Sequence, residues 1–245
     1  MFSIKDKVII VTGSSGLLGQ QIVKSLRTQG GIVFEADISF NEITSFCLNM
    51  DISDEEAVKN GMQKVLDIYG KIDGWVNNAY PRTKDWGNKL ENIPIESWRK
   101  NVDMHMNGYF ICSRIALEQM KIQKFGSLIN MSSIYGIVAP DFTVYNGTDM
   151  TSPAAYAAIK GGLVNLTRYF AAYYGPFQVR ANCISPGGIF DHQQEEFVNN
   201  YCNKVPMKRM GNPKDVVPAI HFLLADETSY LTGQNIIIDG GWSII

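Results

Sequence analysis

The sequence predicts a single α/β domain in which a seven-stranded, doubly wound parallel sheet carries helices on both faces. Short apolar runs rich in β-branched residues alternate with helical patterns along the whole chain, as in sheets whose strands are buried on both sides. With 245 residues, 45% of them hydrophobic, the chain can bury one large core. No repeat, low-complexity stretch or linker divides it.

Seven strands and five helices follow from these patterns. The expected strands are residues 7–12, 32–37, 46–49, 72–77, 127–131, 178–184 and 235–239, and the expected helices are 16–29, 54–69, 95–121, 153–174 and 213–224. About 13 residues separate Asp37 from Asp51, which is close to the lower limit for a parallel crossover. The helix of that crossover is therefore expected to be very short or absent.

Composition excludes several classes of protein. The formal charge is −2 with both signs interspersed, so neither a nucleic-acid partner nor a membrane surface is indicated. No apolar run reaches the roughly 18 residues of a membrane span, and the first residues lead into a strand, so a cytoplasmic protein is predicted. The cysteines and histidines are dispersed without metal-ligand or disulfide spacing: Cys47, Cys112, Cys183, Cys202, His105, His192 and His221. No metal site is predicted.

Tyr156 and Lys160 form a candidate proton-transfer pair. Four residues are about one helical turn, so both side chains lie on one face of the expected helix 153–174. A phenol ordinarily titrates near pKa ~10, and a nearby ammonium favours the phenolate. Tyr80 and Lys84 have the same spacing, but Pro81 biases Tyr80 away from helical geometry. Tyr156 and Lys160 are therefore the candidates for general acid/base chemistry.

A second group of residues predicts a Rossmann-type nucleotide site. Gly13, Gly16 and Gly19 lie where the first strand turns into a helix, and they permit close approach of a pyrophosphate to free helix N–H groups. Asp37 ends the second strand, where a carboxylate accepts both ribose hydroxyls and repels a 2′-phosphate. NAD is therefore favoured over NADP. Asp51 is a candidate either for the adenine edge or for capping the next helix.

Six ordered motifs, taken together, resemble the short-chain dehydrogenase/reductase family. They are the glycine turn, Asn77-Asn-Ala79, Ser133, Tyr156-x-x-x-Lys160, Ser185-Pro-Gly187 and the segment from Leu231 to Gly241. The resemblance implies that Tyr156 exchanges a proton with the substrate oxygen while hydride moves between the neighbouring carbon and nicotinamide. It also implies that Lys160 lowers the tyrosine pKa and holds the nicotinamide ribose. Ser133 would polarise the reacting group, with Ser132 as the adjacent alternative.

The resemblance further implies a cofactor-binding set. Its members are Gly13, Ser15, Gly16, Leu18, Gly19, Asp37, Asp51, Ile52, Asn77, Ala79, Tyr156, Lys160, Pro186 and Gly187. Relatives commonly pair helices corresponding to residues 95–121 and 153–174 and pack their C-terminal strands, so a homodimer or homotetramer is expected. Trp242, Ile244 and Ile245 offer an apolar tail for such packing.

Two departures from the family pattern bear on the substrate. The glycine turn reads T-G-x-x-G-x-x-G, the spacing of the extended branch, which is rich in nucleotide-sugar enzymes. Ser133 and Tyr156 stand 23 residues apart, so segment 139–151 with Tyr145 must loop over or beside the substrate. The chain ends at Ile245 without room for the separate sugar-nucleotide lobe of that branch. A polyhydroxylated or carbohydrate-derived substrate is predicted, and an insertion without substrate meaning is the alternative.

Two further departures concern the reaction site. His105 falls seven residues after Trp98, where the family's relay asparagine is expected. Its imidazole is a candidate proton relay, its backbone carbonyl could preserve that role, and a partly buried histidine at a helix kink is the alternative. Tyr80 replaces a family glycine and begins a polar loop, in which Arg82 and Lys84 either reach an anionic group or are solvated. Substrate loops are expected at about 80–92, 139–152 and 187–206, with these candidate contacts: Tyr80, Tyr145, Gly188 and His192.

The combined prediction is an NAD-dependent oxidoreductase that interconverts a secondary alcohol and a ketone on a sugar-derived or other polar metabolite. One alternative is a 3-oxoacyl-thioester (acyl carrier protein) reductase, which would usually prefer NADPH and need a basic patch. Another is a catalytically silent dinucleotide-binding regulatory protein, an alternative motivated by the substitutions at His105 and Tyr80.

Overall fold

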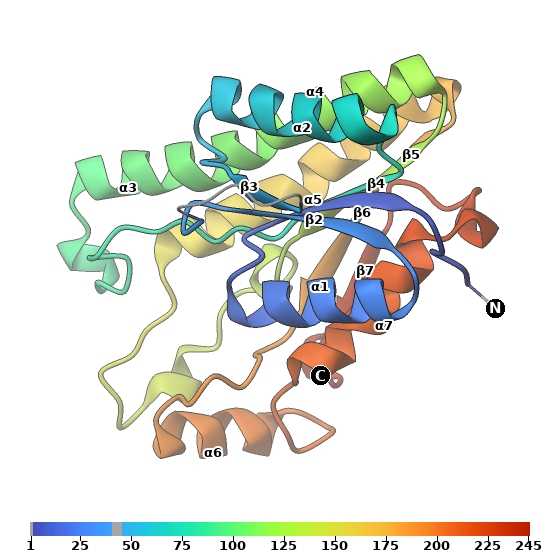
Figure 1. Cartoon of the computed structure of the whole chain (residues 1–245). Coiled ribbons are helices and arrows are strands. Elements are labelled where there is room, and N and C mark those ends of the chain that lie inside the picture. The colour runs from blue at the N-terminus through green and yellow to red at the C-terminus, as the bar shows by residue number, and fades with distance from the viewer. Residues whose placement is uncertain (1, 41–45) are drawn as a thin grey trace.

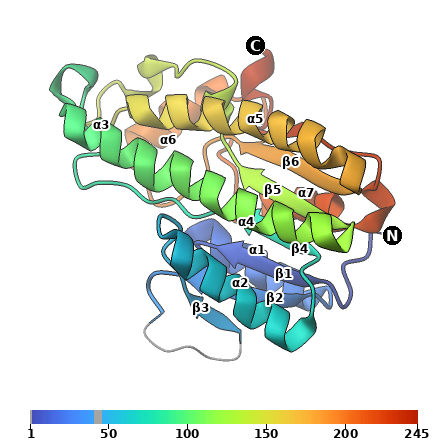
Figure 2. The same ribbon diagram turned by 90° about the horizontal axis from the view of Figure 1, so that it is seen from above.

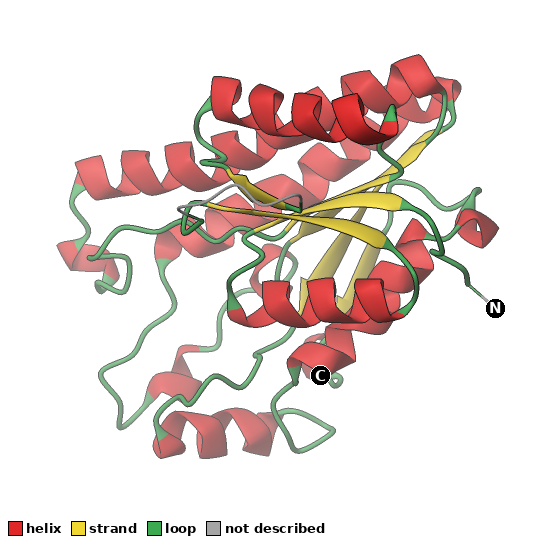
Figure 3. Ribbon diagram, viewed as in Figure 1, coloured by secondary structure: helices red, strands yellow, loops and turns green. Residues whose placement is uncertain are grey.

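Seven parallel strands form one sheet in the order β3-β2-β1-β4-β5-β6-β7. Figure 3 draws the strands in yellow between helices in red. The computed structural model describes residues 2–40 and 46–245. The strands are β1 (Val8–Thr12), β2 (Ile32–Asp37), β3 (Cys47–Asn49), β4 (Gly74–Asn77), β5 (Gly126–Met131), β6 (Val179–Pro186) and β7 (Asn235–Ile238). The predicted fold class is confirmed. The strand order reverses between β1 and β4, and ligands of such sheets bind at the carboxyl ends beside that reversal.

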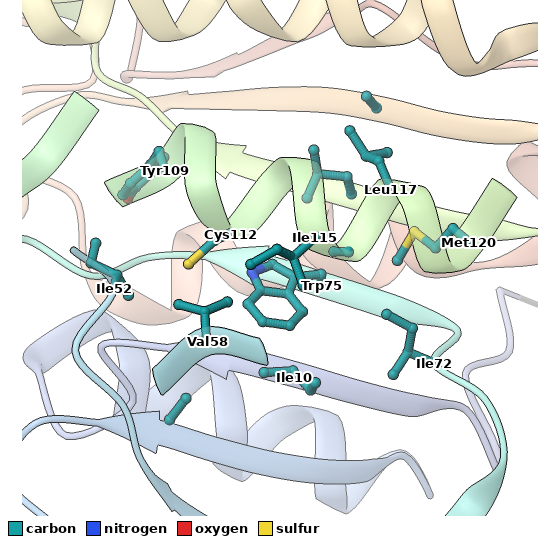
Figure 4. Close-up of a cluster of buried hydrophobic side chains, with 14 of the residues drawn as sticks. Ile10, Ile52, Val58, Ile72, Trp75, Tyr109, Cys112, Ile115, Leu117 and Met120 are labelled. Carbon is teal, nitrogen blue, oxygen red and sulfur yellow. The ribbon is translucent and has the colours of Figure 1, made fainter. Parts of the chain in front are cut away.

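Helices cover both faces of the sheet and explain why the central strands are so apolar. One face carries α2 (Glu55–Tyr69), α4 (Gly108–Gln123) and α5 (Ala154–Tyr174), and the other carries α1 (Leu17–Thr28) and α7 (Pro213–Leu224), as Figures 1 and 2 show. Every residue of β1, β4 and β6 is buried. Trp75 of β4 is fully buried among side chains that include Val58 of α2 and Ile115 of α4 (Figure 4).

The helix expected over residues 95–121 has a local change of winding. It consists of α3 (Ile95–Asn101), a π-helical stretch (Val102–Asn107) and α4. Turns of this kind often occur at functional positions, because the extra residue per turn re-aims a side chain. Here the wide turn contains His105, whose side chain is fully buried.

The prediction that residues 187–206 form only a loop is wrong, because α6 (Glu195–Lys204) lies within them. This helix is mostly polar and buries only Phe197 and Tyr201, which lie four residues apart on one face, so few apolar residues mark it in the sequence. α6 packs on the inserted segment 139–152, which contains a short 3-10 helix (Phe142–Tyr145). Figure 1 shows α6 apart from the helices that flank the sheet. A third hydrophobic cluster forms there from Ile134, Val144, Phe197, Tyr201, Val205, Met210 and Trp242.

Three further observations depend on which residues the structure describes. The expectation of a very short or absent helix between β2 and β3 falls largely on residues 41–45, which lie outside the described residues. Within the described residues, no helix combines the length and the apolar character needed to cross a membrane. Across residues 2–40 and 46–245, no group of three or more His, Cys, Asp or Glu side chains is placed to hold a metal ion.

Candidate active site

The glycine turn after β1 is shaped by close backbone contacts. Gly13 has a φ of +64°, and a Cβ atom there would lie 2.5 Å from the Cα atom of Ala79. A Cβ at Gly19 would lie 2.1 Å from the Gly13 carbonyl oxygen. Asn78 donates from Nδ2 to the carbonyl oxygens of Thr12 (3.2 Å) and Gly13 (3.0 Å), which ties the end of β4 to the turn. The predicted glycines therefore have steric reasons, and Asn78 adds a clamp that sequence reasoning missed.

The first turn of α1 is arranged to receive an anion. Gly16 is the N-cap, no side chain caps the helix, and the first turn contains no carboxylate. Neither the Leu18 nor the Gly19 amide has a hydrogen-bond acceptor among the described residues. A Cβ at Gly16 would meet nothing closer than 3.4 Å, so the space beside it is open. Free amides at a helix N-terminus fit the pyrophosphate of a dinucleotide.

Asp37 lies beside this turn, as the sequence predicts. One carboxylate oxygen accepts a hydrogen bond from the Ser15 amide (3.1 Å) and the other accepts one from the Ser39 amide (3.0 Å). The hydroxyl oxygens of Ser15 and Ser39 are 3.0 Å apart. Within the part of the chain that the structure describes, no lysine or arginine pairs with Asp37. Two fixed acceptor oxygens with remaining lone pairs suit a ribose diol.

Asp51 and Ile52 follow the third strand. Asp51 is exposed and accepts hydrogen bonds from the amide (2.9 Å) and the hydroxyl (2.7 Å) of Ser53. The alternative that Asp51 caps the next helix is wrong, because Asp54 accepts from the amides of Glu56 and Ala57 at the start of α2. Ile52 is buried, so its side chain belongs to the core. A contact between Asp51 and adenine remains a prediction.

The Asn77 side chain supports the site from within the core. Its Oδ1 accepts from Trp75 Nε1 (2.8 Å), and its Nδ2 donates to Ser113 Oγ (2.9 Å) and Asn130 Oδ1 (2.8 Å). The residue is fully buried. The sequence-based expectation that Asn77 lines the cofactor site is therefore not met by its side chain, which holds the ends of β4 and β5 together.

Ser133, Tyr156 and Lys160 come together where β5 and α5 meet. The ammonium nitrogen of Lys160 lies 5.5 Å from the ring centroid of Tyr156 and donates to the Met131 carbonyl oxygen (2.7 Å). Ser132 Oγ donates to the Lys160 carbonyl oxygen (2.8 Å), so this hydroxyl is committed to anchoring α5. The Ser133 hydroxyl instead lies beside the Tyr156 phenol. Of the two serines, Ser133 is the candidate for contacting a substrate.

Burial dominates the electrostatics of this pair and overturns one expectation. It raises the pKa of Tyr156, the neighbouring Tyr80 adds to the rise, and the Ser133 hydroxyl acts in the opposite direction. Burial also lowers the pKa of Lys160 from 10.5 to about 7. The expected lowering of the tyrosine pKa by a lysine charge is therefore absent from this arrangement, because loss of water opposes both charged forms.

His105 contacts Lys160, the position that the relay prediction requires, and its role as a relay stays a prediction. Its Nε2 lies 3.3 Å from Lys160 Nζ. When Lys160 is charged it donates to Nε2, and the ring proton then lies on Nδ1, which has no partner among the described residues. Burial and the Lys160 charge hold the pKa of His105 well below its usual range. Asn107 points elsewhere and bonds to Asp103.

Aromatic rings form one wall beside Tyr156. The ring of Tyr80 lies edge-on to Tyr156 (5.6 Å between centroids) and to Trp86 (5.8 Å). Trp86 donates from Nε1 to the Tyr80 hydroxyl (2.8 Å), a contact that sequence reasoning missed although a lone tryptophan in a polar loop was a visible signal. Arg82 lies over the Tyr80 ring at 5.0 Å. Loop 80–92 is held by hydrogen bonds to α3, as from the Thr83 amide to Asn101 Oδ1 (3.0 Å).

The remaining predicted substrate contacts divide into two groups. Tyr145 stacks on Phe197 of α6 (5.2 Å between centroids), and its hydroxyl lies 3.5 Å from that of Tyr135. The Gly188 amide donates to the Tyr201 hydroxyl (2.6 Å), which fixes the backbone after β6. His192 is exposed, has a φ of +58°, and packs beside Phe190 rather than beside the other predicted residues. The structure therefore brings Tyr145 toward the site and leaves His192 outside it.

Together these groups can bind a dinucleotide along the carboxyl edge of the sheet and exchange a proton at Tyr156 next to it. Comparison with known proteins agrees. Residues 18–243 match the protein family described as enoyl-(acyl carrier protein) reductase. The chain is 31% identical to the post-translational flagellin modification protein A of Campylobacter coli, over 98% of this chain and 100% of that protein. It is 29% identical to an NAD-dependent glycerol dehydrogenase of Listeria innocua, over 99% of this chain and 96% of that protein.

The solved structures point the same way. The crystal structure of a short-chain dehydrogenase from Leptospira borgpetersenii with bound NAD⁺ superposes with a TM-score of 0.89 at 32% identity. The match covers 98% of this chain and 94% of that one. The likeness thus extends over the glycine turn, the Tyr156 region and the C-terminal strand.

Proposed function

The chain belongs to the short-chain dehydrogenase/reductase family, whose members act on CH–OH groups, and we propose that it is an NAD-dependent enzyme interconverting a secondary alcohol and a ketone on a sugar-derived or other polar metabolite. One observation carries the proposal. Ser133, Tyr156 and Lys160 converge at the carboxyl edge of the sheet, beside a glycine turn that fits a dinucleotide. The two hydroxyl groups and the lysine side chain could transfer a proton at the place where hydride transfer would occur.

The residues of the chain would act as follows. NAD bound beside Tyr156 would supply the redox chemistry, as the acceptor of hydride during oxidation and, in its reduced form, as the donor during reduction. The Ser133 hydroxyl holds the substrate oxygen, and the Tyr156 phenol takes its proton during oxidation or returns it during reduction. Lys160 is held by the Met131 carbonyl and His105 Nε2, and in its charged form it would stabilise the Tyr156 phenolate that forms. The ring of Tyr80 excludes water from one side of the phenol.

Asp37 supports NAD as the cofactor rather than NADP. Its carboxylate is held by two backbone amides at the position that the adenosine ribose would occupy, and a 2′-phosphate there would meet a fixed negative charge. Titration of the pure protein with NADH and NADPH, followed by nicotinamide fluorescence, should show at least about tenfold tighter binding of NADH, or roughly 1.4 kcal/mol. Asp37→Ala should bring the dissociation constants for NADH and NADPH closer together. Tighter NADPH binding by the unchanged protein would contradict the NAD assignment.

The hydroxyl groups around Tyr156 support a polar substrate. Tyr135 and Tyr145 present phenols near the reaction site, and Tyr80 adds a third. Phenols both donate and accept hydrogen bonds, as binding of a polyol requires. The glycerol dehydrogenase among the relatives acts on a polyol by its name, which is consistent with this class.

One relative favours a second candidate, a 3-oxoacyl-thioester reductase, because the chain is 29% identical to a 3-oxoacyl-[acyl-carrier-protein] reductase of Thermotoga maritima. Such an enzyme would be expected to prefer NADPH, which the position of Asp37 opposes. Reduction of an acetoacetyl thioester with NADPH, faster than oxidation of any polyol with NAD, would favour this candidate. The alternative of a catalytically silent protein is set aside, because serine, tyrosine and lysine are all in place.

The decisive experiment for the reaction compares the wild-type protein with Tyr156→Phe. We expect NAD reduction in the presence of polyols to fall by about 10²–10⁴-fold in the variant, the usual contribution of a positioned acid/base group. NADH binding should stay within about threefold, since the phenol oxygen alone is removed. Tyr230→Phe, which removes a hydroxyl from a fully exposed ring outside the site, is the matched control. A Tyr156→Phe protein with undiminished turnover would refute the assignment.

A homodimer or homotetramer is part of the same proposal. Phe110 on α4 and Tyr169 and Tyr173 on α5 are exposed, and the two tyrosine rings stack in parallel. Aromatic side chains gathered on two adjacent helices suit a twofold interface with a second copy. Light scattering should report a dimer or tetramer, and a monomer at micromolar concentration would contradict it. Cytoplasmic location stays a prediction.

A further inference from the structure

The inserted segment and α6 form a small lobe with preformed walls. Asn200 of α6 donates to the carbonyl oxygens of Val144 (3.3 Å) and Asn146 (3.0 Å). Lys204 pairs with Asp141, and Tyr145 stacks on Phe197. Three kinds of contact therefore hold the insertion against α6, so it is an ordered surface.

A hollow of about 420 Å³ lies between this lobe and loop 80–92. The loop contributes Lys89, Leu90 and Glu91, while the insertion contributes Phe142, Tyr145 and Thr148 among others. The opposite wall is also anchored, since Ser97 Oγ donates to Asp85 Oδ1 (2.7 Å) within the loop's attachment to α3. A volume of this size falls within the range of small-molecule sites.

The chemistry of the hollow suits a polyhydroxylated group. Leu90 is 75% exposed and Phe142 is 59% exposed, so two large apolar side chains border the same space and would lose water contact when a ligand enters. Lys89 contributes a donor and Glu91 an acceptor. Apolar faces together with donors and acceptors match the C–H faces and hydroxyls of a sugar or polyol.

Tyr145 connects the hollow to the reaction site. It lines the hollow, and its hydroxyl lies 3.5 Å from that of Tyr135, two residues beyond Ser133. It also contributes to raising the pKa of Tyr156, so the two phenols share one electrostatic environment. A ligand that extends from Tyr156 past Tyr145 would enter the hollow.

We propose that this hollow binds the end of an elongated polyhydroxylated substrate, remote from the carbon that is oxidised, with Leu90 and Phe142 against its C–H faces. The inference rests on the proposed function and adds a second binding subsite to it. The insertion between Ser133 and Tyr156 would thereby act as a small substitute for a separate substrate lobe. Binding energy from such a remote group can be used to orient the reacting carbinol.

A series of polyols that differ in length tests the inference. NAD reduction is measured with glycerol, erythritol, ribitol and D-glucitol, all of which carry secondary carbinols. We expect kcat/KM to rise with length, by about tenfold from glycerol to D-glucitol, since filling an apolar subsite typically has such an effect. In the double variant Leu90→Ala, Phe142→Ala the value for D-glucitol should fall toward that for glycerol. Both residues are exposed, so the fold should tolerate these changes.

Phe125→Ala is the matched control, because it removes an exposed phenylalanine that lies between α4 and β5, outside the hollow. It should keep the length dependence. A flat series in the wild-type protein, or a rise that persists in the double variant, would overturn the subsite while leaving alcohol oxidation in place. Absence of oxidation with every polyol, although NAD binds, would contradict the proposed function and with it this inference.

Discussion

The nucleotide edge and the insertion lobe are built in different ways. The nucleotide edge consists mainly of backbone groups: a glycine with positive φ, free helix amides and a carboxylate held by two amides, all within residues 12–39. The lobe consists of side chains from distant segments. Val144, Tyr201 and Trp242 share one hydrophobic cluster although they span about 100 residues.

This difference shows why one half can be read from the sequence and the other cannot. A site made of backbone groups needs small residues at fixed spacing, and that spacing is visible in the sequence. A site assembled from packed side chains needs only apolar residues that meet in space, so it leaves no local pattern. The lobe can therefore vary its residues while the nucleotide edge cannot, which fits one cofactor site serving different substrates.

The largest expected effect comes from removing the support of the lobe. Trp242 is buried and stacks on Tyr201 (4.5 Å between centroids), whose hydroxyl accepts from the Gly188 amide. Trp242→Ala should lower the free energy of unfolding by about 3 kcal/mol. It should also raise KM for polyols more than the Kd for NADH, measured by urea denaturation and fluorescence titration. Tyr230→Ala, at a fully exposed ring, is the control. Equal changes in the KM for polyols and the Kd for NADH would contradict the distinction between the lobe and the nucleotide edge.

Two glycine substitutions test the nucleotide edge. Gly19→Ala would force a Cβ against the Gly13 carbonyl and should cost about 1–3 kcal/mol of stability. Gly16→Ala meets nothing closer than 3.4 Å, so stability should change by less than about 0.5 kcal/mol. The same methyl should still weaken NADH binding about tenfold, because it faces the open space beside free amides. Unchanged NADH affinity in Gly16→Ala would place the pyrophosphate elsewhere.

Lys160 is held by the end of β5 and by His105, and it should show a conflict between activity and stability. Its pKa is lowered from 10.5 to about 7, so the unfolded chain binds more protons between those values. The free energy of unfolding should therefore rise with pH from about 7 to 10.5 through this group. Lys160→Met should stabilise the protein at pH 7 by on the order of 2 kcal/mol, with a smaller gain near pH 10. Urea denaturation across pH checks this, and a variant less stable at pH 7 would contradict it.

The smallest effect is expected at His105. Its Nε2 accepts from Lys160, so the substitution His105→Asn would keep an acceptor at this position while His105→Leu would remove it. We expect His105→Leu to lower kcat by about tenfold and His105→Asn by less, with added imidazole restoring part of the loss if proton transfer is impaired. The measurement is kcat against pH and imidazole concentration. Asn107→Ala, on the exposed side of the same turn, is the control, and equal activity of all three variants would leave His105 with a packing role.

Several parts of the molecule follow from the chain alone. The seven strands, the Tyr156–Lys160 spacing, the glycine turn and Asp37 could be predicted because each is encoded by neighbours in the sequence. The insertion was also visible as extra length between Ser133 and Tyr156.

Other parts were decided only by the tertiary structure. The polar helix α6 forms because the insertion packs on it, and Asn77 turns inward because Trp75, Ser113 and Asn130 satisfy its amide. Burial, which depends on the whole fold, raises the pKa of Tyr156 and lowers that of Lys160, the reverse of what spacing suggested for the tyrosine. Spacing along the chain determines which groups can meet, whereas the exclusion of water determines which charge states they hold.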